Sequence, residues 1–154
     1  MYKQIVVGTD GSTGANMALD AAIELARLTG ATLHVVNAHK MTTSYQLAAA
    51  TEVGIAAGNI AESNEVLREQ AERICDQAVE RADGAGVRAE AHCVAGDAAD
   101  ALLKVAEDAG CDLLVVGNRG MAGVRRFVLG SVPNKLSHHC PSSLLIVDTS
   151  EARS

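Results

Sequence analysis

The chain has 154 residues, a formal net charge of −6 and a sequence pI near 5.3. Its length favours one domain, and 48% hydrophobic against 21% charged residues is typical of a soluble globular protein. The acidic balance argues against a nucleic-acid-binding surface, and no apolar run is long enough to cross a membrane. We therefore expect one folded domain over residues 1–150 and a frayed end at 151–154.

The four cysteines (Cys75, Cys93, Cys111 and Cys140) are far apart and form no CxxC pair. Reduced thiols in a cytoplasmic protein are the simplest interpretation. We expect Cys75 and Cys93 to act as small hydrophobic residues rather than as nucleophiles.

Five short apolar runs predict β-strands, and segments with helical periodicity separate them. The strands are expected at Ile5–Val7, Leu33–Val36, Val87–Ala95, Leu113–Val116 and Leu144–Val147. The helices are expected at about 15–30, 67–84, 98–110 and 131–139, with Asp97 as the N-cap of the third. Residues 40–60 fit no clean element and are expected to form a loop or an irregular helix.

This alternation predicts an α/β fold, with a doubly wound parallel sheet of five strands and helices on both faces. The third strand alternates apolar and polar residues, as an edge strand does, and the strand order 3-2-1-4-5 fits this pattern. That order leaves an uncovered apolar edge at the fifth strand. We therefore predict a homodimer that pairs through this strand, formed by Leu144, Leu145, Ile146 and Val147.

Glycines and polar residues follow the first and fourth strands, where a doubly wound sheet binds its ligands. Gly8-Thr9-Asp10 follows the first strand, and Gly117-Asn118-Arg119-Gly120 follows the fourth. Nine residues later, Gly130-Ser131-Val132 begins the last helix.

The second of these loops meets the physical requirements of a phosphate-binding loop. Its glycines let backbone N–H groups approach a ligand, and the helix start at Gly130 favours an anion. Arg119, Arg125 and Arg126 lie in the same stretch, which holds no acidic residue between Gly117 and Pro141. An anionic ligand is the preferred interpretation, and a glycine-rich surface turn with solvated arginines is the alternative.

The pattern Gly117-x2-Gly120-x9-Gly130-Ser131 resembles the nucleotide-binding signature of the universal stress protein family. Val-Val-Gly-Thr-Asp-Gly-Ser near the start and Leu33–Val36 resemble that family's first two strands, and the likeness runs from Lys3 to Asp148. The resemblance implies a flavodoxin-like, Rossmann-like fold, usually dimeric. It also implies a bound ATP or related adenine nucleotide, with Mg²⁺ as a companion of the phosphates.

The resemblance also implies roles for single residues around the nucleotide. Gly8 and Thr9 would lie beside the base, Asp10 near the ribose or phosphates, and the main chain of Val35 against adenine. Ribose and phosphate contacts would come from Gly117, Gly120, Gly130, Ser131 and Val132. Arg119 lies inside the signature, and its role as a phosphate contact is our inference from its charge.

The sequence gives less support to other nucleotide-binding motifs and to a metal site. Neither glycine-rich loop supplies the Lys-Ser/Thr pair of a Walker A motif, and the first loop is not GxGxxG. His138-His139-Cys140 fits a helix end better than a metal cluster, because adjacent helical ligands point in different directions. His34 is expected to be a packed core or dimer residue.

Two classes of function remain open. The preferred one is a stress-linked nucleotide-binding sensor or regulator without strong catalysis, with no catalytic residue and no resident metal site. The alternatives are a slow ATPase or nucleotide-dependent phosphotransferase with Asp10 as metal ligand, a binder of a cyclic-AMP-type nucleotide, and an interaction module that binds no nucleotide.

Overall fold

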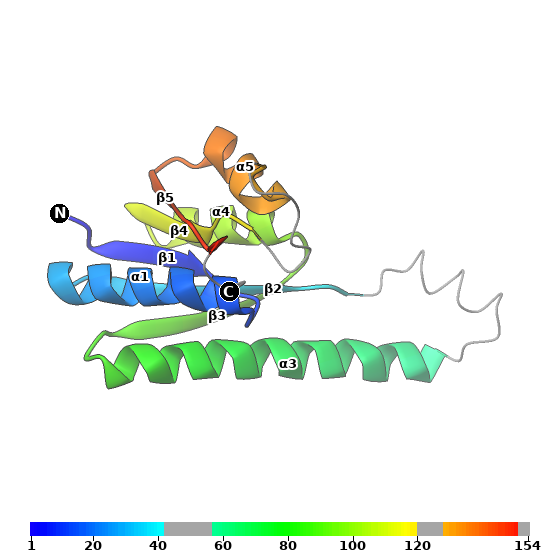
Figure 1. The fold of residues 1–154 in the computed structure, drawn as a ribbon. Helices are drawn as coiled ribbons and strands as arrows, with labels where there is room; N and C mark the ends of the chain where they lie inside the picture. Colours follow the sequence, from blue (N-terminus) through cyan, green and yellow to red (C-terminus); the bar gives the residue numbers. More distant parts are fainter. Residues whose placement is uncertain (42–56, 120–127, 151–154) are drawn as a thin grey trace.

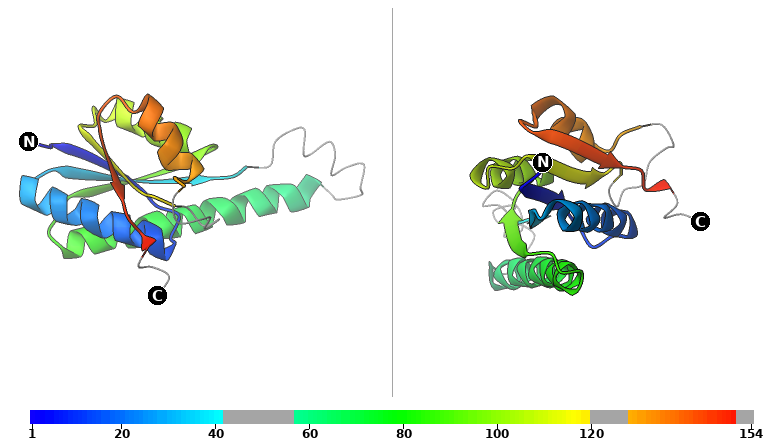
Figure 2. Two further views of the ribbon diagram at one scale, coloured as in Figure 1. Left: turned by 45° about the horizontal axis from the view of Figure 1, so that its top comes forward. Right: turned by 90° about the vertical axis from the view of Figure 1, so that its left-hand side faces the viewer.

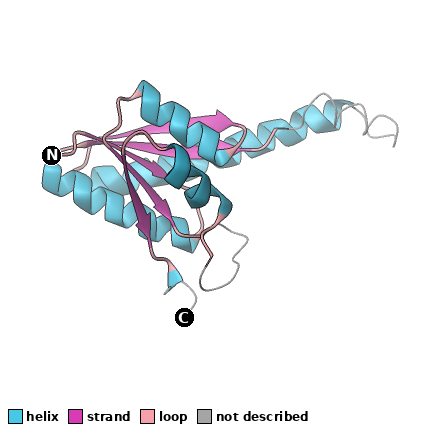
Figure 3. Ribbon diagram, turned by 90° about the horizontal axis from the view of Figure 1, so that it is seen from above, coloured by secondary structure: helices cyan, strands magenta, loops and turns pink. Residues whose placement is uncertain are grey.

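The computed structural model of the chain describes residues 1–41, 57–119 and 128–150. Its centre is a sheet of five parallel strands in the order β3-β2-β1-β4-β5, which confirms the predicted order (Figure 1). Seen from above, the strands fan out with the usual twist of a sheet (Figure 3). They are β1 (Gln4–Gly8), β2 (Thr32–His39), β3 (Ala89–Ala95), β4 (Leu113–Gly117) and β5 (Ser143–Val147).

Helices cover both faces of this sheet, as the doubly wound prediction requires (Figure 2). On one face lie α1 (Thr13–Thr29) and α3 (Ala57–Gly84), and on the other lie α4 (Ala98–Asp108) and α5 (Ser131–His139). None of the helices within the described ranges is long and apolar enough to cross a membrane.

Local signals in the sequence account for the helix ends. Ser12 accepts a 3.1 Å hydrogen bond from the N–H of Ala15 at the start of α1, and Gly30 ends that helix with φ of 71°. At α4, the Asp97 side chain accepts a 3.0 Å bond from the N–H of Asp100. This bond is the main reason why the pKa of Asp97 lies below its usual value, and it confirms the predicted cap.

The core consists of two layers, because successive residues of a strand face opposite sides. Ile5 and Val7 of β1 pack with α1 and α3, whereas Val6 packs with α4 and α5, and all three are fully buried. Lys135 of α5 pairs with Asp100 of α4 at 2.8 Å, which joins the two helices of the second layer.

The edge strand β3 confirms the prediction made from its alternating pattern. Ala89 and Cys93 pack toward the layer that holds α1 and α3, whereas Glu90 and His92 alternate with them on the strand. Cys75 of α3 is fully buried beneath this strand, and burial raises the pKa of its thiol to about 12. Such a thiol acts as a small hydrophobic group, as expected.

Helix α3 begins ten residues earlier than the periodic stripe indicates, at Ala57 instead of Leu67. Figure 1 shows its N-terminal part extending past the sheet. There Arg68 forms ion pairs with Glu65 and with Glu72, one turn away on each side. These pairs support a helical segment whose described side chains are mostly exposed to solvent. Of the predicted irregular segment at 40–60, residues 57–60 are therefore helical, and 42–56 lie outside the described residues, as do 151–154.

Candidate functional site

A hollow opens where β1 and β4 end, at the position predicted for a ligand. It contains about 590 Å³ of space, the part open to solvent included. The strands β1, β2 and β4, the helices α1, α4 and α5 and the loops after β1 and β4 contribute its described walls. The lining residues are Gly8, Thr9, Asp10, Ala15, Val36, Ala38, Ala98, Leu102, Val116, Gly117, Arg119, Val132 and Pro133.

The loop after β1 is held by its own hydrogen bonds. The Thr9 N–H donates to the carbonyl of Val36 at 2.9 Å, and the Thr9 carbonyl accepts from the Asn37 side chain at 2.8 Å. Asp10 Oδ1 accepts a 2.9 Å bond from the Ser12 N–H, which is an Asx turn. These bonds fix the direction in which the chain leaves the strand and enters α1.

One side of the hollow is apolar. Val36 and Ala38 from β2, Leu102 from α4 and Val116 from β4 line it. Leu102 lies so close to Gly8 that a Cβ on this glycine would come within 3.1 Å of its side chain. The glycine therefore allows α4 to pack tightly over the end of β1, and this packing shapes the apolar wall.

Asn118 follows β4 directly and lies in the chain between two residues that line the hollow, Gly117 and Arg119. Its Oδ1 accepts bonds from the Thr149 N–H at 3.1 Å and from the Thr149 hydroxyl at 2.6 Å, and its Nδ2 donates to Asp148 at 3.0 Å. Its carbonyl accepts from the Gly130 N–H at 3.0 Å. One residue thus ties the end of β4 to the end of β5 and to the start of α5.

Gly130 is the N-cap of α5, and the backbone there is extended. Because this cap is a glycine, it offers no side-chain oxygen to the N–H groups of the first helical turn, so they remain available to an anion. Ser131 is the first helical residue, and its side chain is exposed. Val132 and Pro133 of the same turn line the hollow.

Arg119 is the one cationic side chain among the described lining residues. Its Nε is buried and has no hydrogen-bond partner within the described ranges. A buried N–H donor without a partner carries a free-energy cost, which an anionic or hydrogen-bond-accepting ligand would remove. The charge of Arg119 also contributes to the lowered pKa of Asp148, after the bonds from Ser150 and Asn118.

Six of the predicted site residues line the hollow: Gly8, Thr9, Asp10, Gly117, Arg119 and Val132. Gly130 and Ser131 stand at its rim, outside this lining set, and Gly120, Arg125 and Arg126 lie outside the described residues. The Val35 side chain is fully buried against α1 and α3, on the other face of the sheet, so β2 lines the hollow with Val36 and Ala38 instead.

The sequence-based prediction missed Ala38, Leu102 and the bracing role of Asn118. The position of Val36 could have been predicted from the alternation of side chains along β2. If Val35 points to one face of the sheet, Val36 must point to the other. The residues that hydrogen-bond with the Asn118 side chain lie about thirty residues further along the chain, so no local sequence pattern predicts them.

Comparison of the sequence with models of known protein families shows which family the chain belongs to. The model of the universal stress protein family matches residues 1–148. The chain belongs to the universal stress protein family. Among its relatives, the universal stress protein YxiE of Bacillus subtilis is 31% identical over 147 residues, covering 96% of this chain and 99% of its own. A universal stress protein of Mycobacterium tuberculosis is 33% identical over 153 residues, covering 96% and 97%.

A solved structure of a universal stress protein in complex with cAMP has a TM-score of 0.72 and 30% identity to this chain. The match covers 97% of this chain and 99% of that one. The family match over residues 1–148 agrees with the resemblance at Lys3–Asp148, and the described residues contain the 3-2-1-4-5 sheet.

Proposed function

We propose that the hollow binds an adenine nucleotide of the ATP type, and that the protein acts as a nucleotide-dependent stress regulator. The observation that carries this proposal is the meeting of two anion-binding features at one rim. The buried Nε of Arg119 and the glycine-capped start of α5 belong to the same hollow as an apolar wall. A nucleotide has the matching halves, an apolar base and an anionic tail.

In this arrangement the base rests on the apolar side, against Val36, Ala38 and Leu102. The phosphates face Arg119 and the backbone N–H groups of Ser131 and Val132. The main chain of Gly8 and Thr9 lies beside the base and that of Gly117 beside the sugar, and Val35 contributes only backbone. The solved relative in complex with cAMP, at 30% identity, supports an adenine nucleotide as the ligand class.

Binding without efficient turnover fits the groups that are present. Asp10 is the only carboxylate among the described lining residues, and one of its oxygens already accepts the Ser12 N–H. Its carboxylate fits the oxygen-ligand preference of Mg²⁺, so Asp10 would hold a Mg²⁺ that accompanies the phosphates. Phosphoryl transfer needs further cations around the transferred group and a residue that orients the nucleophile.

Calorimetric titration of the purified protein with ATP, ADP, AMP and cAMP tests the proposal. We expect one nucleotide per chain with a dissociation constant in the micromolar range or below. Heat from none of the four would contradict nucleotide binding. A phosphate-release assay on the same sample, beside the Asp10→Ala variant, separates the regulator from the slow ATPase. Phosphate release that the variant loses would favour the enzyme.

The same proposal includes a homodimer that forms through β5. This strand pairs only with β4 within the described residues, and its other edge is open. Leu144, Leu145, Ile146 and Val147 are half-buried in a single chain. Pairing of two such edges would satisfy the open backbone groups and cover these apolar side chains.

A further inference from the structure

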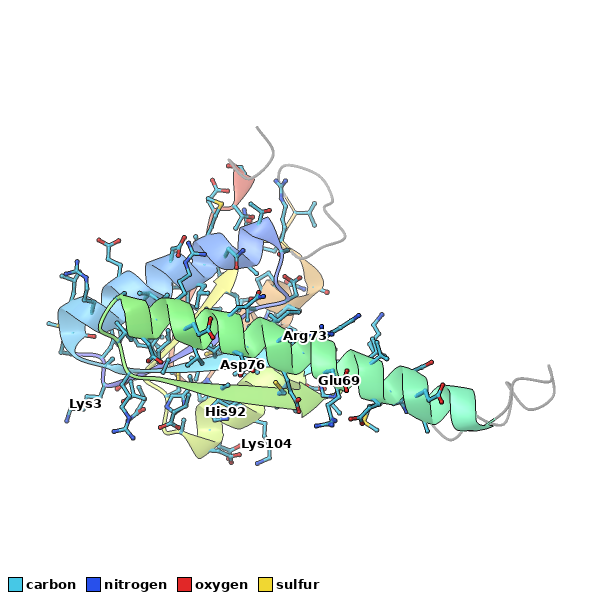
Figure 4. All side chains as sticks on the ribbon, turned by 90° about the horizontal axis from the view of Figure 1, so that it is seen from below. Lys3, Glu69, Arg73, Asp76, His92 and Lys104 are labelled. Carbon is cyan, nitrogen blue, oxygen red and sulfur yellow. The ribbon has the colours of Figure 1, made fainter. Side chains whose placement is uncertain are left out.

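A second cluster of ligand-type side chains lies at the β3 edge of the sheet, and none of its members lines the hollow. It consists of His34 on β2 together with Glu90 and His92 on the edge strand β3, where Figure 4 labels His92. In the register of these strands His34 is opposite Glu90, and His92 is two residues further along. All three side chains therefore leave the same face of the sheet.

The ligand atoms converge on one point. His34 Nδ1 lies 3.0 Å from His92 Nε2 and 3.8 Å from a carboxylate oxygen of Glu90, and all three atoms lie within 4.8 Å of one another. Two ligands of a tetrahedral Zn²⁺ ion are separated by about 3.4 Å, since each bond is about 2.1 Å long. The observed separations lie on both sides of this value, so small side-chain rotations would complete the geometry.

A fourth residue holds His34 in the state that a metal requires. His34 Nε2 is 2.8 Å from the amide oxygen of Gln4, and an amide oxygen can only accept, so Nε2 carries the proton. The lone pair of His34 is then on Nδ1, the nitrogen that faces His92 and Glu90. A hydrogen bond of this kind at the outer nitrogen is typical of metal-bound histidines.

The surroundings of His34 favour its neutral imidazole. The His34 side chain is only 9% exposed, and burial together with the nearby His92 lowers the pKa of His34, although Glu90 opposes this shift. A neutral imidazole is the form that binds metal. The neighbouring cation is Arg88, 80% exposed, whose Nη2 lies 3.6 Å from Glu90, close enough to be displaced when the carboxylate turns to an ion.

We propose that His34 Nδ1, His92 Nε2 and the Glu90 carboxylate bind a divalent first-row transition-metal ion, with Zn²⁺ as the best fit. Two imidazoles and one carboxylate match the ligand preferences of such ions, and three protein ligands leave a fourth position to water. Gln4 acts as a positioning residue through His34. This site is separate from any Mg²⁺ that accompanies a nucleotide, and it does not depend on the proposed function.

Calorimetry with metal-free protein that carries no histidine tag tests the site, using Zn²⁺ alone and no nucleotide. We expect one Zn²⁺ per chain. His92→Gln and Glu90→Gln change accessible side chains and should each weaken binding at least about tenfold while the circular dichroism spectrum stays the same. Gln4→Leu should weaken Zn²⁺ binding without changing the stoichiometry. Because His34 is buried, its variants are not needed for the test.

The double variant His138→Gln/His139→Gln is the matched control, since it removes two exposed imidazoles from the end of α5. It should bind Zn²⁺ like the original protein. Titration with Co²⁺ should produce the intense visible absorption of a four- or five-coordinate ion, and His92→Gln should abolish it. No Zn²⁺ binding, unchanged binding in both β3 variants, or loss only in the α5 control would each overturn the proposal.

Discussion

The Gly130 N–H donates a 3.0 Å hydrogen bond to the carbonyl of Asn118, so the start of α5 is tied to the first residue after β4. The Asn118 side chain extends this link to Thr149 beyond β5, with bonds of 3.1 Å and 2.6 Å. One residue therefore joins the ends of β4 and β5 to the start of α5, and two of these elements, β4 and α5, line the hollow.

Asn118→Ala should lower the free energy of unfolding by about 1–3 kcal/mol, because it leaves the polar groups of the buried Thr149 without their acceptor. Urea unfolding measures this loss. Asn134→Ala, on the exposed side of α5, is the matched control and should stay within about 0.5 kcal/mol. Equal stability of the Asn118 variant and the original protein would show that the hydrogen bonds of the Asn118 side chain do not stabilise the fold.

Gly117→Ala should destabilise the protein by about 1–3 kcal/mol, because a Cβ there would lie 3.1 Å from the Thr149 methyl group. Gly84→Ala meets open space at the end of α3 and should be stabilising by about 0.4–1 kcal/mol. Urea midpoints of the two variants should therefore move in opposite directions. A Gly117 variant as stable as the original protein would contradict this packing.

Ala38→Phe should prevent nucleotide binding without changing the melting temperature of the free protein by more than a few degrees. Ala38 is half-buried at the apolar side of the hollow, so the larger ring would occupy the space proposed for the base. Ala85→Phe places the same ring on an exposed turn and should bind normally. Calorimetry compares the two, and full affinity in the Ala38 variant would mean that the base lies elsewhere.

Ile146→Lys should convert the expected dimer into monomers on size-exclusion chromatography, because a charge would be buried where two β5 edges meet. Ala95→Lys adds the same charge at the exposed end of the opposite edge strand and should leave the dimer intact. Circular dichroism of both variants verifies folding. A dimer that survives in the folded Ile146 variant would rule out pairing through β5.

Much of the fold follows from local sequence patterns. The continuous apolar runs of β1 and β4 and the alternation in β3 suffice to predict which strands are central and which lies at an edge. The Asp97 cap and the helix at 131–139 also follow from short-range signals. Such features depend on neighbouring residues, so one sequence is enough to predict them.

The remaining features depend on contacts between distant residues. Gly117 lines the hollow, and its missing Cβ also makes room for Thr149 from beyond β5. His34 is buried, as predicted for a packed core residue, but its position beside Glu90 and His92 depends on the register of β2 against β3. Strand register and contacts between distant side chains of this kind can be established only from the three-dimensional structure.

Arg119 is proposed to recognise the phosphate of a bound adenine nucleotide. Parallel calorimetric titrations of AMP and adenosine into the original protein and into Arg119→Ala test it most directly, with Arg88→Ala, an exposed arginine, as control. A charge-assisted hydrogen bond contributes about 1.5–3 kcal/mol, so the original protein and the control should prefer AMP by roughly 10- to 100-fold. Arg119→Ala should lose most of this preference and retain its affinity for adenosine. Equal binding of AMP and adenosine by the original protein, or undiminished preference for AMP in Arg119→Ala, would contradict the claim.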